Sequence, residues 1–397
     1  MTTIEHDLRL PLRRDEKARA AFVSGLRRYV LNDMAGELRR HFEKSAEPDY
    51  RARYGHVPRN GREAHEALQA NDYFRFYSSL RVTSQDMLYH SVRPAIERHQ
   101  PTLLQRAQQL AGSDCGSLQL KADFPVPRSV SAFDIHLMPG SYTAEYGPDD
   151  LTMGAVYENR LAISTFGTFG PNLDDIGQSL SRFIRVRYPD FKPRRILDLG
   201  CTVGHNTGSW KDSYPDADVH GIDVAAPCLR YALARAQSQR RALHFQQMNA
   251  EALEFADASF DVVFSSMFLH EVPPKGIPKV FSEAYRVLRP GGLMLHMELP
   301  PASELSAYDS FYLDWDGHYN EEPFYRAFRA QDPRAVVSAA GFRAQDYLQF
   351  VVPSFNALGE QHWLRSIEAT LPVNSEKTGR LSEGLRWFCF GAWKRDH

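Results

Sequence analysis

The sequence predicts an α/β protein in which a doubly wound sheet of seven strands follows an α-helical N-terminal domain. Two observations carry this prediction. From residue 194 onward, strand-like and helix-like segments alternate, which implies parallel strand pairing with helices on both faces. In the first hundred residues helical periodicity dominates instead. A length of 397 residues also exceeds the usual size of one domain, so more than one structural unit is expected.

Composition and charge indicate an ordinary globular protein. Hydrophobic residues make up 43% and charged residues 24%, with a net charge of −2, an ordinary globular balance without a global charge for binding nucleic acid. The small basic surplus of residues 1–110 is interpreted as solvated helix faces. The four scattered cysteines lack metal-ligand spacing and fit a reducing compartment. Without an apolar signal core or a long apolar run, we expect a cytoplasmic protein with no membrane span.

Residues 1–111 are predicted to form the helical N-terminal domain. Apolar residues recur at every fourth position from Phe22 to Phe42, as on one face of a helix. Two further helices are expected over residues 62–81 and 83–99, the second capped by Thr83 or Ser84 and closed by Pro101. The aromatic cluster of residues 73–77 is interpreted as core packing, with substrate binding as the alternative.

Residues 112–172 lose the helical periodicity and accumulate Pro, Gly, Phe and Tyr. This composition predicts an irregular cap or linker that lines the site, since long irregular segments are often lids or binding loops. The third unit, residues 173–397, begins with a helix over 173–188. Its strands are predicted at residues 195–200, 216–223, 242–249, 259–266, 291–299, 344–352 and 385–394.

The stretch from Arg195 to Gly204 is the predicted cofactor-binding turn. A strand ends at Asp198-Leu-Gly200 and a glycine-containing turn leads into a helix, at the sheet edge where open α/β folds bind ligands. The turn lacks the full GxGxxG fingerprint, and its carboxylate would repel a pyrophosphate but suits a cationic ligand. The next strand ends in Asp223, which can accept hydrogen bonds from both hydroxyls of a ribose.

Residues 190–300 resemble the class I S-adenosylmethionine (SAM)-dependent methyltransferases, in the branch that acts on small molecules such as quinone precursors. The resemblance implies a Rossmann-like fold and a first motif at Asp198, Gly200 and Gly204, in which Thr202 replaces the middle glycine. It further implies ribose binding by Asp223 and adenine contacts from Asn249-Ala250-Glu251. The full set of implied SAM-binding residues is Asp198, Gly200, Cys201, Thr202, Gly204, Asp223, Val224, Asn249, Ala250, Glu251 and Ser265.

The residues that would act on the methyl acceptor are harder to predict from the sequence than those that would bind the cofactor. His270 follows the fourth core strand and is the candidate base, with Glu271 to orient it; the alternative is that both support the loop. Tyr157 in the cap and His318 in a polar, aromatic loop at 309–325 complete the candidate catalytic set as acceptor contacts. The resemblance extends acceptor contact to other cap residues such as Tyr142, Tyr146 and Glu158. A metal site of Asp314, Asp316 and His318 is the weaker interpretation of that loop, and no metal is predicted.

The leading functional hypothesis is methyl transfer from SAM to an O, N, S or C atom of a small-molecule acceptor by direct displacement, with S-adenosylhomocysteine as product. The helical domain would act as a cap, a homodimer interface or both. One alternative is a methyltransferase acting on RNA, DNA or protein, although Ser265-Ser-Met-Phe replaces the Pro-Pro-Tyr type of motif that amino-methylating DNA enzymes use. The other alternative is a SAM-binding protein that transfers no methyl group.

Overall fold

The computed structural model describes residues 5–112, 115–368 and 385–395. Its sheet follows the order β1-β4-β3-β2-β5-β6-β8-β7, in which β8 is antiparallel to β6 and β7 and the other pairs are parallel. The strands are β1 (Ser117–Gln119), β2 (Arg195–Leu199), β3 (Asp218–Asp223), β4 (His244–Gln247), β5 (Phe260–Ser266), β6 (Leu288–Glu298), β7 (Tyr347–Pro353) and β8 (Arg386–Trp393).

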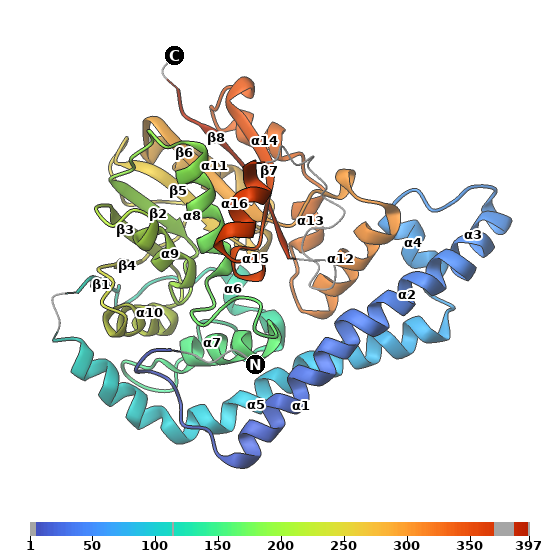
Figure 1. The fold of residues 1–397 in the computed structure, drawn as a ribbon, viewed down its shortest axis with the longest axis horizontal. Coiled ribbons are helices and arrows are strands. Elements are labelled where there is room, and N and C mark those ends of the chain that lie inside the picture. The colour runs from blue at the N-terminus through green and yellow to red at the C-terminus, as the bar shows by residue number, and fades with distance from the viewer. Residues whose placement is uncertain (1–4, 113–114, 369–384, 396–397) are drawn as a thin grey trace.

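The doubly wound, Rossmann-like sheet is confirmed, and all seven predicted strands are present. An eighth strand, the short β1, is added at the edge by residues 112–172. One face of the sheet packs against α8 (Asp175–Arg187), α9 (His205–Ser213), α10 (Ala226–Ser238) and α16 (Glu360–Glu368), and the other against α11 (Ile277–Val287) and α14 (Pro333–Ala339) (Figure 1). Both layers are dominated by aliphatic and aromatic side chains, the usual source of stability in such folds.

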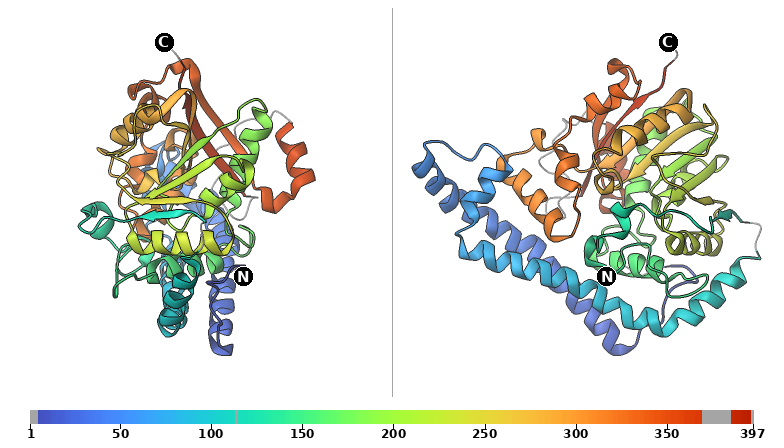
Figure 2. Two further views of the ribbon diagram at one scale, coloured as in Figure 1. Left: turned by 90° about the vertical axis from the view of Figure 1, so that its left-hand side faces the viewer. Right: turned by 180° about the vertical axis from the view of Figure 1, so that it is seen from behind.

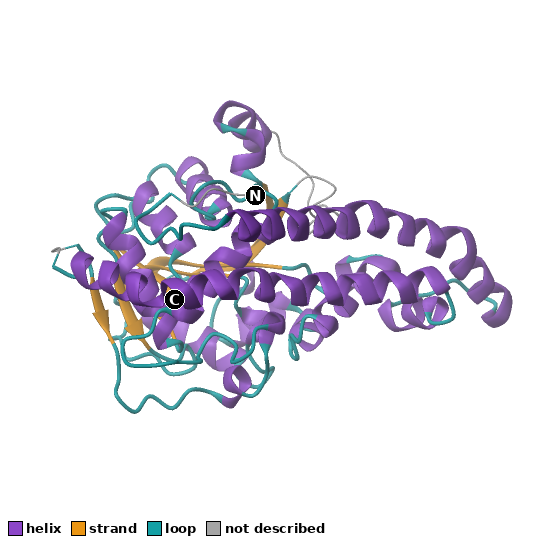
Figure 3. Cartoon of the chain, turned by 90° about the horizontal axis from the view of Figure 1, so that it is seen from below, coloured by secondary structure: helices purple, strands orange, loops and turns teal. Residues whose placement is uncertain are grey.

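The N-terminal part forms a long helical hairpin beneath the sheet (Figure 2). The chain runs out along α1 (Arg14–Arg28), α2 (Ala35–His41) and α3 (Glu47–Tyr54), which two π-helical segments at Tyr29–Met34 and Phe42–Ala46 join into one rod. It returns along α4 (Gly61–Leu68) and α5 (Asp72–Leu110), and the two arms lie side by side (Figure 3).

The π-helical segments explain the fourfold spacing of apolar residues in the rod. In an α-helix each step of four residues turns the side chain by about 40° beyond a full circle, so a strict fourfold stripe drifts around the helix. The wider turns of a π-helix reverse this drift. Val30, Met34, Leu38 and Phe42 therefore all stay buried, whereas Phe22, which precedes the first wide turn, is exposed.

The prediction of separate helices over 62–81 and 83–99 was wrong. Helix α5 continues through Ser84, whose hydroxyl donates to the Arg81 carbonyl, and through Pro94 and Pro101. A proline inside a helix costs about 3 kcal/mol in isolation. Here buried residues on both sides, such as Leu88, Val92 and Leu103, pack on α1 and on α7 (Thr152–Ser164), which outweighs that cost.

Two segments expected to be irregular are partly helical. The segment 112–172 contains α6 (Arg128–Ser131) and α7 in addition to β1. The polar stretch 309–325 is mostly helix α12 (Ala307–Tyr319), followed after a short turn by α13 (Tyr325–Arg329). One face of α12 packs against the far end of the hairpin through Tyr308, Phe311 and Trp315. These residues have the spacing of one helix face, but the polar residues between them make the pattern hard to recognise in the sequence. The described residues also contain the short α-helix α15 (Phe355–Leu358) and four single-turn 3₁₀ helices at Ile135–Leu137, Leu269–Glu271, Ala302–Glu304 and Ala344–Asp346.

Among the described residues, no helix combines the length and apolar character needed to cross a bilayer, and this includes the long α5.

Candidate active site

The turn between β2 and α9 contains three residues with left-handed backbone conformation. Gly200, Thr202 and Gly204 have φ values of 69°, 49° and 72°. A Cβ atom on Gly200 would lie 2.3 Å from the Phe268 ring, and one on Gly204 would lie 2.9 Å from the Phe245 ring. Glycine is therefore required at both positions, while the β-branched Thr202 carries strain of about 1–2 kcal/mol.

Asp223, the last residue of β3, connects this turn to the next one. Its Oδ2 atom accepts the Thr202 N–H at 3.0 Å, and its Oδ1 atom accepts the Ala225 N–H at 2.9 Å. Burial raises the pKa of Asp223 to about 6, against the lowering effect of these backbone bonds. Each carboxylate oxygen keeps a lone pair for a further donor, such as a hydroxyl group in the neighbouring cavity.

A cavity of about 140 Å³ lies at the carboxyl ends of β2, β3 and β5. The cap segment and the turn after β5 complete its walls, at the edge where doubly wound folds bind ligands. Eleven of the residues singled out in the sequence line this cavity: Tyr142, Tyr157, Gly200, Thr202, Asp223, Val224, Asn249, Ala250, Glu251, His270 and Glu271.

Three residues of the first motif lie beneath this cavity and do not line it. Asp198 is buried, and its Oδ2 atom accepts the Thr207 hydroxyl at 2.6 Å. Burial raises the pKa of Asp198 to about 8, so the carboxyl group holds a proton at neutral pH unless a cation binds nearby. The Cys201 side chain belongs to the core on one face of the sheet, and Gly204 precedes the first residue of α9.

At the end of β5, the serine predicted to bind the cofactor does not line the cavity. The Ser265 hydroxyl lies 2.8 Å from His296 Nδ1, within the sheet core, whereas the next residue, Ser266, lines the cavity. Successive side chains of a strand point to opposite faces, so a shift by one residue exchanges the two environments. The buried Ser266 hydroxyl has no hydrogen-bond partner among the described residues.

The opposite wall of the cavity contains His270, which is held by a buried carboxylate. Its Nδ1 atom lies 2.7 Å from Glu298 Oε2, and Glu298 Oε1 accepts the N–H groups of Phe268 and Leu269 at 2.8 and 2.6 Å. Its Nε2 atom is 4.0 Å from Glu322 Oε2, too far for a hydrogen bond. Burial alone would lower the pKa of His270, but the charges of Glu298 and Glu322 raise it to about 9.

A second histidine, His136 of the cap, joins the same wall and was not found from the sequence. Its ring lies 3.5 Å from Glu271 Oε1 and 3.1 Å from Glu322 Oε1, and the Tyr142 hydroxyl donates to Glu271 at 2.8 Å. Burial opposes the charged ring, but the two glutamates raise the pKa of His136 to about 9. No sequence motif surrounds His136, and only the fold brings it to Glu271 and Glu322.

A second and larger cavity, of about 1060 Å³, adjoins this wall on its other side. Glu322 and Tyr325 line it, together with aromatic residues of the cap and of α12. His318 also faces this second cavity and does not line the first one. The structure therefore places His318 and His270 in two different cavities.

The carboxylates near His318 are paired with arginines. Asp314 accepts Arg329 at 2.5 Å, and Asp316, on another side of α12, accepts Arg81 of the hairpin at 2.6 Å. Over residues 5–112, 115–368 and 385–395, no three His, Cys, Asp or Glu side chains come together as metal ligands. The arrangement of α12 thus gives no support to the metal interpretation of this stretch.

Helix α7 presents neighbouring residues to two different environments. Tyr157 lines the cavity of about 140 Å³, where burial raises its pKa, whereas Glu158 is buried beneath this cavity and faces away. Glu158 contacts His6 at 2.9 Å, His205 at 3.0 Å and Arg235 at 2.9 Å. It therefore links the N-terminal segment, the start of α9 and helix α10. Tyr146, also considered in the sequence, is largely exposed.

Comparisons with known proteins place the likeness in the α/β part. A family profile described as "Methyltransferase domain" matches residues 196–292. A demethylmenaquinone methyltransferase of Thermus thermophilus is 36% identical over 109 residues, which cover 28% of this chain and 49% of the relative. A malonyl-[acyl-carrier protein] O-methyltransferase of Pseudescherichia vulneris is 27% identical over 221 residues, 54% of this chain and 82% of the relative.

Among solved structures, phosphoethanolamine N-methyltransferase 2 of Haemonchus contortus in complex with phosphomonomethylethanolamine and S-adenosylhomocysteine is similar at 21% identity. The TM-score is 0.41, and the match covers 58% of this chain and 56% of that one. The chain thus spans about half the length of the Thermus and Haemonchus proteins. The helical hairpin lies outside the matched family profile.

Proposed function

We propose that the chain transfers the methyl group of SAM, bound in the cavity of about 140 Å³ (the cofactor cavity), to a small-molecule acceptor held beside His270, since residues 196–292 match the profile of a methyltransferase domain. The observation that carries this proposal is the orientation of the His270 ring. Its Nδ1 atom is held by Glu298, and its Nε2 atom, in the wall of the cofactor cavity, has no hydrogen bond among the described residues. An oriented imidazole with one free nitrogen is suited to removing a proton from a nucleophile.

The residues of the cavity fit the expected cofactor. The buried Ser266 hydroxyl lacks a partner in the described part of the chain, and Asp223 has carboxylate lone pairs for ribose hydroxyls. The missing side chain of Gly200 leaves room beside Phe268. We assign cofactor binding to these residues together with Thr202 and the Asn249–Glu251 segment. When bound, SAM supplies an electrophilic methyl group on a sulfonium.

The protein side chains align the acceptor, exclude water and remove the proton. The acceptor must be aligned with the methyl group and shielded from water. In the proposed mechanism Glu271 holds Tyr142 and His136, which keeps the cap closed over the acceptor. His270 acts in its neutral form and accepts the acceptor's proton on Nε2, while its Nδ1–H remains bonded to Glu298. A cation bound nearby lowers the pKa of His270 from about 9, so more of the neutral form is present at physiological pH.

The second cavity suggests what the acceptor looks like. Phe133, Trp315, Tyr319 and Tyr325 line it next to Glu322, so an aromatic or apolar body could lie there while its nucleophile reaches His270. Its volume of about 1060 Å³ suits a small molecule. We expect Phe133→Ala to raise KM for such an acceptor and to leave the affinity for S-adenosylhomocysteine unchanged.

The test is formation of S-adenosylhomocysteine with a panel of aromatic and apolar alcohols, amines, thiols and enols. We expect His270→Asn to lower kcat about 100-fold or more while the Kd for S-adenosylhomocysteine stays within threefold. His90→Asn, which changes an exposed histidine of α5, is the matched control and should leave both constants unchanged. Equal kcat in the wild type and in His270→Asn would refute the base, and a bound acceptor without product would favour a SAM-binding protein that transfers no methyl group.

The organisation of the chain belongs to the same proposal. We divide it into a helical unit (1–111), a cap (112–172) and the methyltransferase core (173–397), located in the cytoplasm and without a nucleic-acid partner. The hairpin exposes Phe22, Tyr29 and Phe76, and a homodimer formed through it would cover such side chains. Sedimentation analysis should then show a dimer in the wild type and a monomer in Phe22→Arg/Phe76→Arg.

A further inference from the structure

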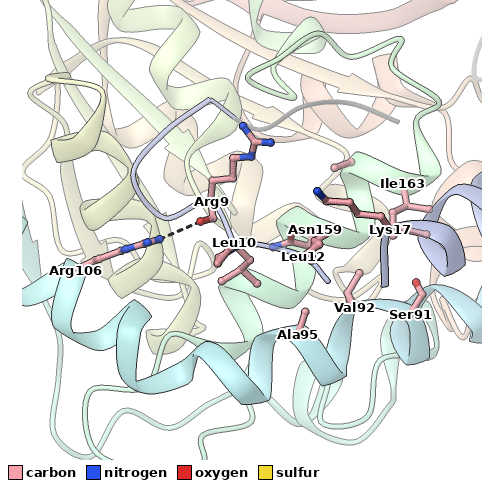
Figure 4. A pocket seen from close by; sticks show the side chains of 13 residues that line it. Arg9, Leu10, Leu12, Lys17, Ser91, Val92, Ala95, Arg106, Asn159 and Ile163 are labelled. Carbon is pink, nitrogen blue, oxygen red and sulfur yellow. Dashed lines mark hydrogen bonds between the residues drawn. The ribbon is translucent and has the colours of Figure 1, made fainter. Parts of the chain in front are cut away.

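A third cavity lies between the N-terminal segment and helices α1, α5 and α7 (Figure 4). Its volume is about 450 Å³, within the range of sites that bind small ligands. None of its lining residues lines the cofactor cavity or the second cavity. They are Arg9, Leu10, Pro11, Leu12, Lys17, Ala20, Ser91, Val92, Ala95, Arg106, Asn159, Ala162 and Ile163.

The charged residues of this cavity are all cationic. Arg106 is bonded to the carbonyl groups of Asp7 and Arg9, at 2.9 and 3.0 Å. The guanidinium of Arg9 and the ammonium of Lys17 have no hydrogen bond or ion pair among the described residues. In Figure 4 Lys17 extends from α1 across the cavity toward the N-terminal segment that carries Arg9. The acidic residue nearest to Lys17 in sequence, Glu16, is paired with Arg98.

The rest of the lining is mostly apolar. Leu10, Val92, Ala95 and Ile163 are buried side chains that face one another across the N-terminal segment, α5 and α7. The polar residue Asn159 is already bonded, because its amide donates to the Ala155 carbonyl at 2.9 Å. The cavity therefore combines an apolar floor with two cations at its rim that have no counter-charge in the described part of the chain.

We propose that this cavity binds a small amphipathic monoanion, such as the carboxylate of a medium-length saturated chain. The head group pairs with Lys17 and Arg9, where charge-assisted hydrogen bonds to a carboxylate are strongest. The hydrocarbon chain covers Leu10, Val92 and Ile163, which removes apolar surface from water. A cation would be repelled by the three basic residues, and a neutral chain would leave Arg9 and Lys17 without a partner among the described residues.

This inference is independent of the proposed methyl transfer, since it concerns a separate cavity. The two sites nevertheless share helix α7. Asn159, Ala162 and Ile163 face the third cavity, whereas Tyr157 faces the cofactor cavity. The test below measures binding alone, so its result does not depend on whether an acceptor is found.

Calorimetric titration of the full chain with decanoate, below its micelle concentration, tests the proposal. We expect saturable binding of one decanoate, and at least tenfold weaker binding in Arg9→Ala/Lys17→Ala. The matched control Arg14→Ala/Arg19→Ala removes two exposed charges from the same helical arm and should bind like the wild type. Decyltrimethylammonium and decanol, with the same chain and a cationic or neutral head, should each bind at least tenfold more weakly than decanoate.

The apolar half of the site has its own variant. Ala162→Phe places a ring in the cavity and should abolish decanoate binding, with thermal unfolding used to check that the variant is folded. If this variant fails to fold, the comparison of Arg9→Ala/Lys17→Ala with Arg14→Ala/Arg19→Ala still tests the proposal. Failure of decanoate to bind at millimolar concentration would overturn the proposal. So would equal binding of decanol, or binding that survives the loss of both Arg9 and Lys17 side chains.

Discussion

The two walls of the cofactor cavity are built in different ways. The cofactor wall consists of backbone turns that directly follow β2 and β3, with Asp223 bonded to the N–H groups of both turns. The acceptor wall consists of side chains from four segments far apart in sequence, represented by His136, His270, Glu298 and Glu322. A local motif can encode the first wall, whereas the second exists only after the chain has folded.

The two walls also differ in charge. The acceptor wall combines three carboxylates with two imidazoles whose pKa values are raised to about 9. The cofactor wall contains Asp223, with Asp198 below it, and burial raises the pKa of both. A cationic cofactor therefore stabilises the ionised form of these two aspartates, while the acceptor wall already contains its own counter-charges.

The largest expected effect comes from Glu158, which is buried beneath the cofactor cavity and contacts His205 at the start of α9. Glu158→Gln removes the counter-charge of Arg235 and the partner of His205, and breaking a buried ion pair in this way costs about 3–5 kcal/mol. Urea unfolding should show this loss, together with weaker binding of S-adenosylhomocysteine because α9 begins at His205. The exposed Glu43→Gln should change stability by no more than about 0.5 kcal/mol. Equal stability of the two variants would contradict the role of Glu158.

Glu298→Gln should damage the acceptor wall alone. Without the carboxylate, the His270 ring loses its orientation and the source of its raised pKa, so we expect kcat to fall about 100-fold. The affinity for S-adenosylhomocysteine should stay within threefold. The activity that remains should rise with pH through a lower midpoint than in the wild type, because neutral His270 is then formed more easily. An unshifted pH profile would assign Glu298 a merely structural role.

Asp223→Ala should damage the cofactor wall alone. The variant loses the acceptor for two backbone N–H groups and for the ribose, which should weaken S-adenosylhomocysteine binding by about 1–3 kcal/mol in calorimetry. Acceptor affinity, measured by KM at saturating SAM, should change little. Asp257→Ala, which alters an exposed aspartate, serves as control. Unchanged cofactor affinity would show that Asp223 does not contact the ligand.

The affinity for SAM should rise with pH between 6 and 8. Asp198 and Asp223 have pKa values of about 8 and 6, and only their ionised forms attract a ligand with a net positive charge. SAM binding at pH 7 should therefore release protons, which titrations in buffers of different ionisation enthalpy can measure. We expect a change in affinity of about tenfold or less. In Asp198→Asn the affinity for SAM should rise less with pH above 7, because the carboxyl group that ionises there has been removed. The pKa values of His136 and His270, about 9, lie too high to replace it.

The smallest effect is expected at Thr202. Thr202→Gly relieves left-handed strain of about 1–2 kcal/mol, but glycine loses about 0.5–1 kcal/mol more entropy on folding. The net gain in stability should be within about 1 kcal/mol, with a few-fold tighter binding of S-adenosylhomocysteine. Ala258→Gly, at φ 51° and away from the cavity, tests the same backbone effect without the ligand. Cofactor binding that tightens equally in both variants would mean that the turn itself is not involved.

Some predictions failed because sequence patterns are local. Pro101 suggests the end of a helix, yet α5 continues through it because packing on neighbouring helices outweighs the lost bond. Ser265 was chosen instead of Ser266, since a strand pattern shows that side chains alternate but not which face meets the cavity. His318, predicted as an acceptor contact, lines the second cavity, where the body of the acceptor is proposed to lie, and does not line the cavity of His270.

The sheet and the turn after β2 can be predicted from local sequence patterns. Alternating strand and helix patterns specify a doubly wound fold, and Gly200, Gly204 and Asp223 lie within turns whose shape depends on nearby residues. Only the tertiary structure decided the acceptor wall and the cationic third cavity. Their side chains, such as His136, Glu322 and Lys17, are ordinary polar residues in sequence. They acquire a chemical role because folding brings distant segments together and removes water from around their charges.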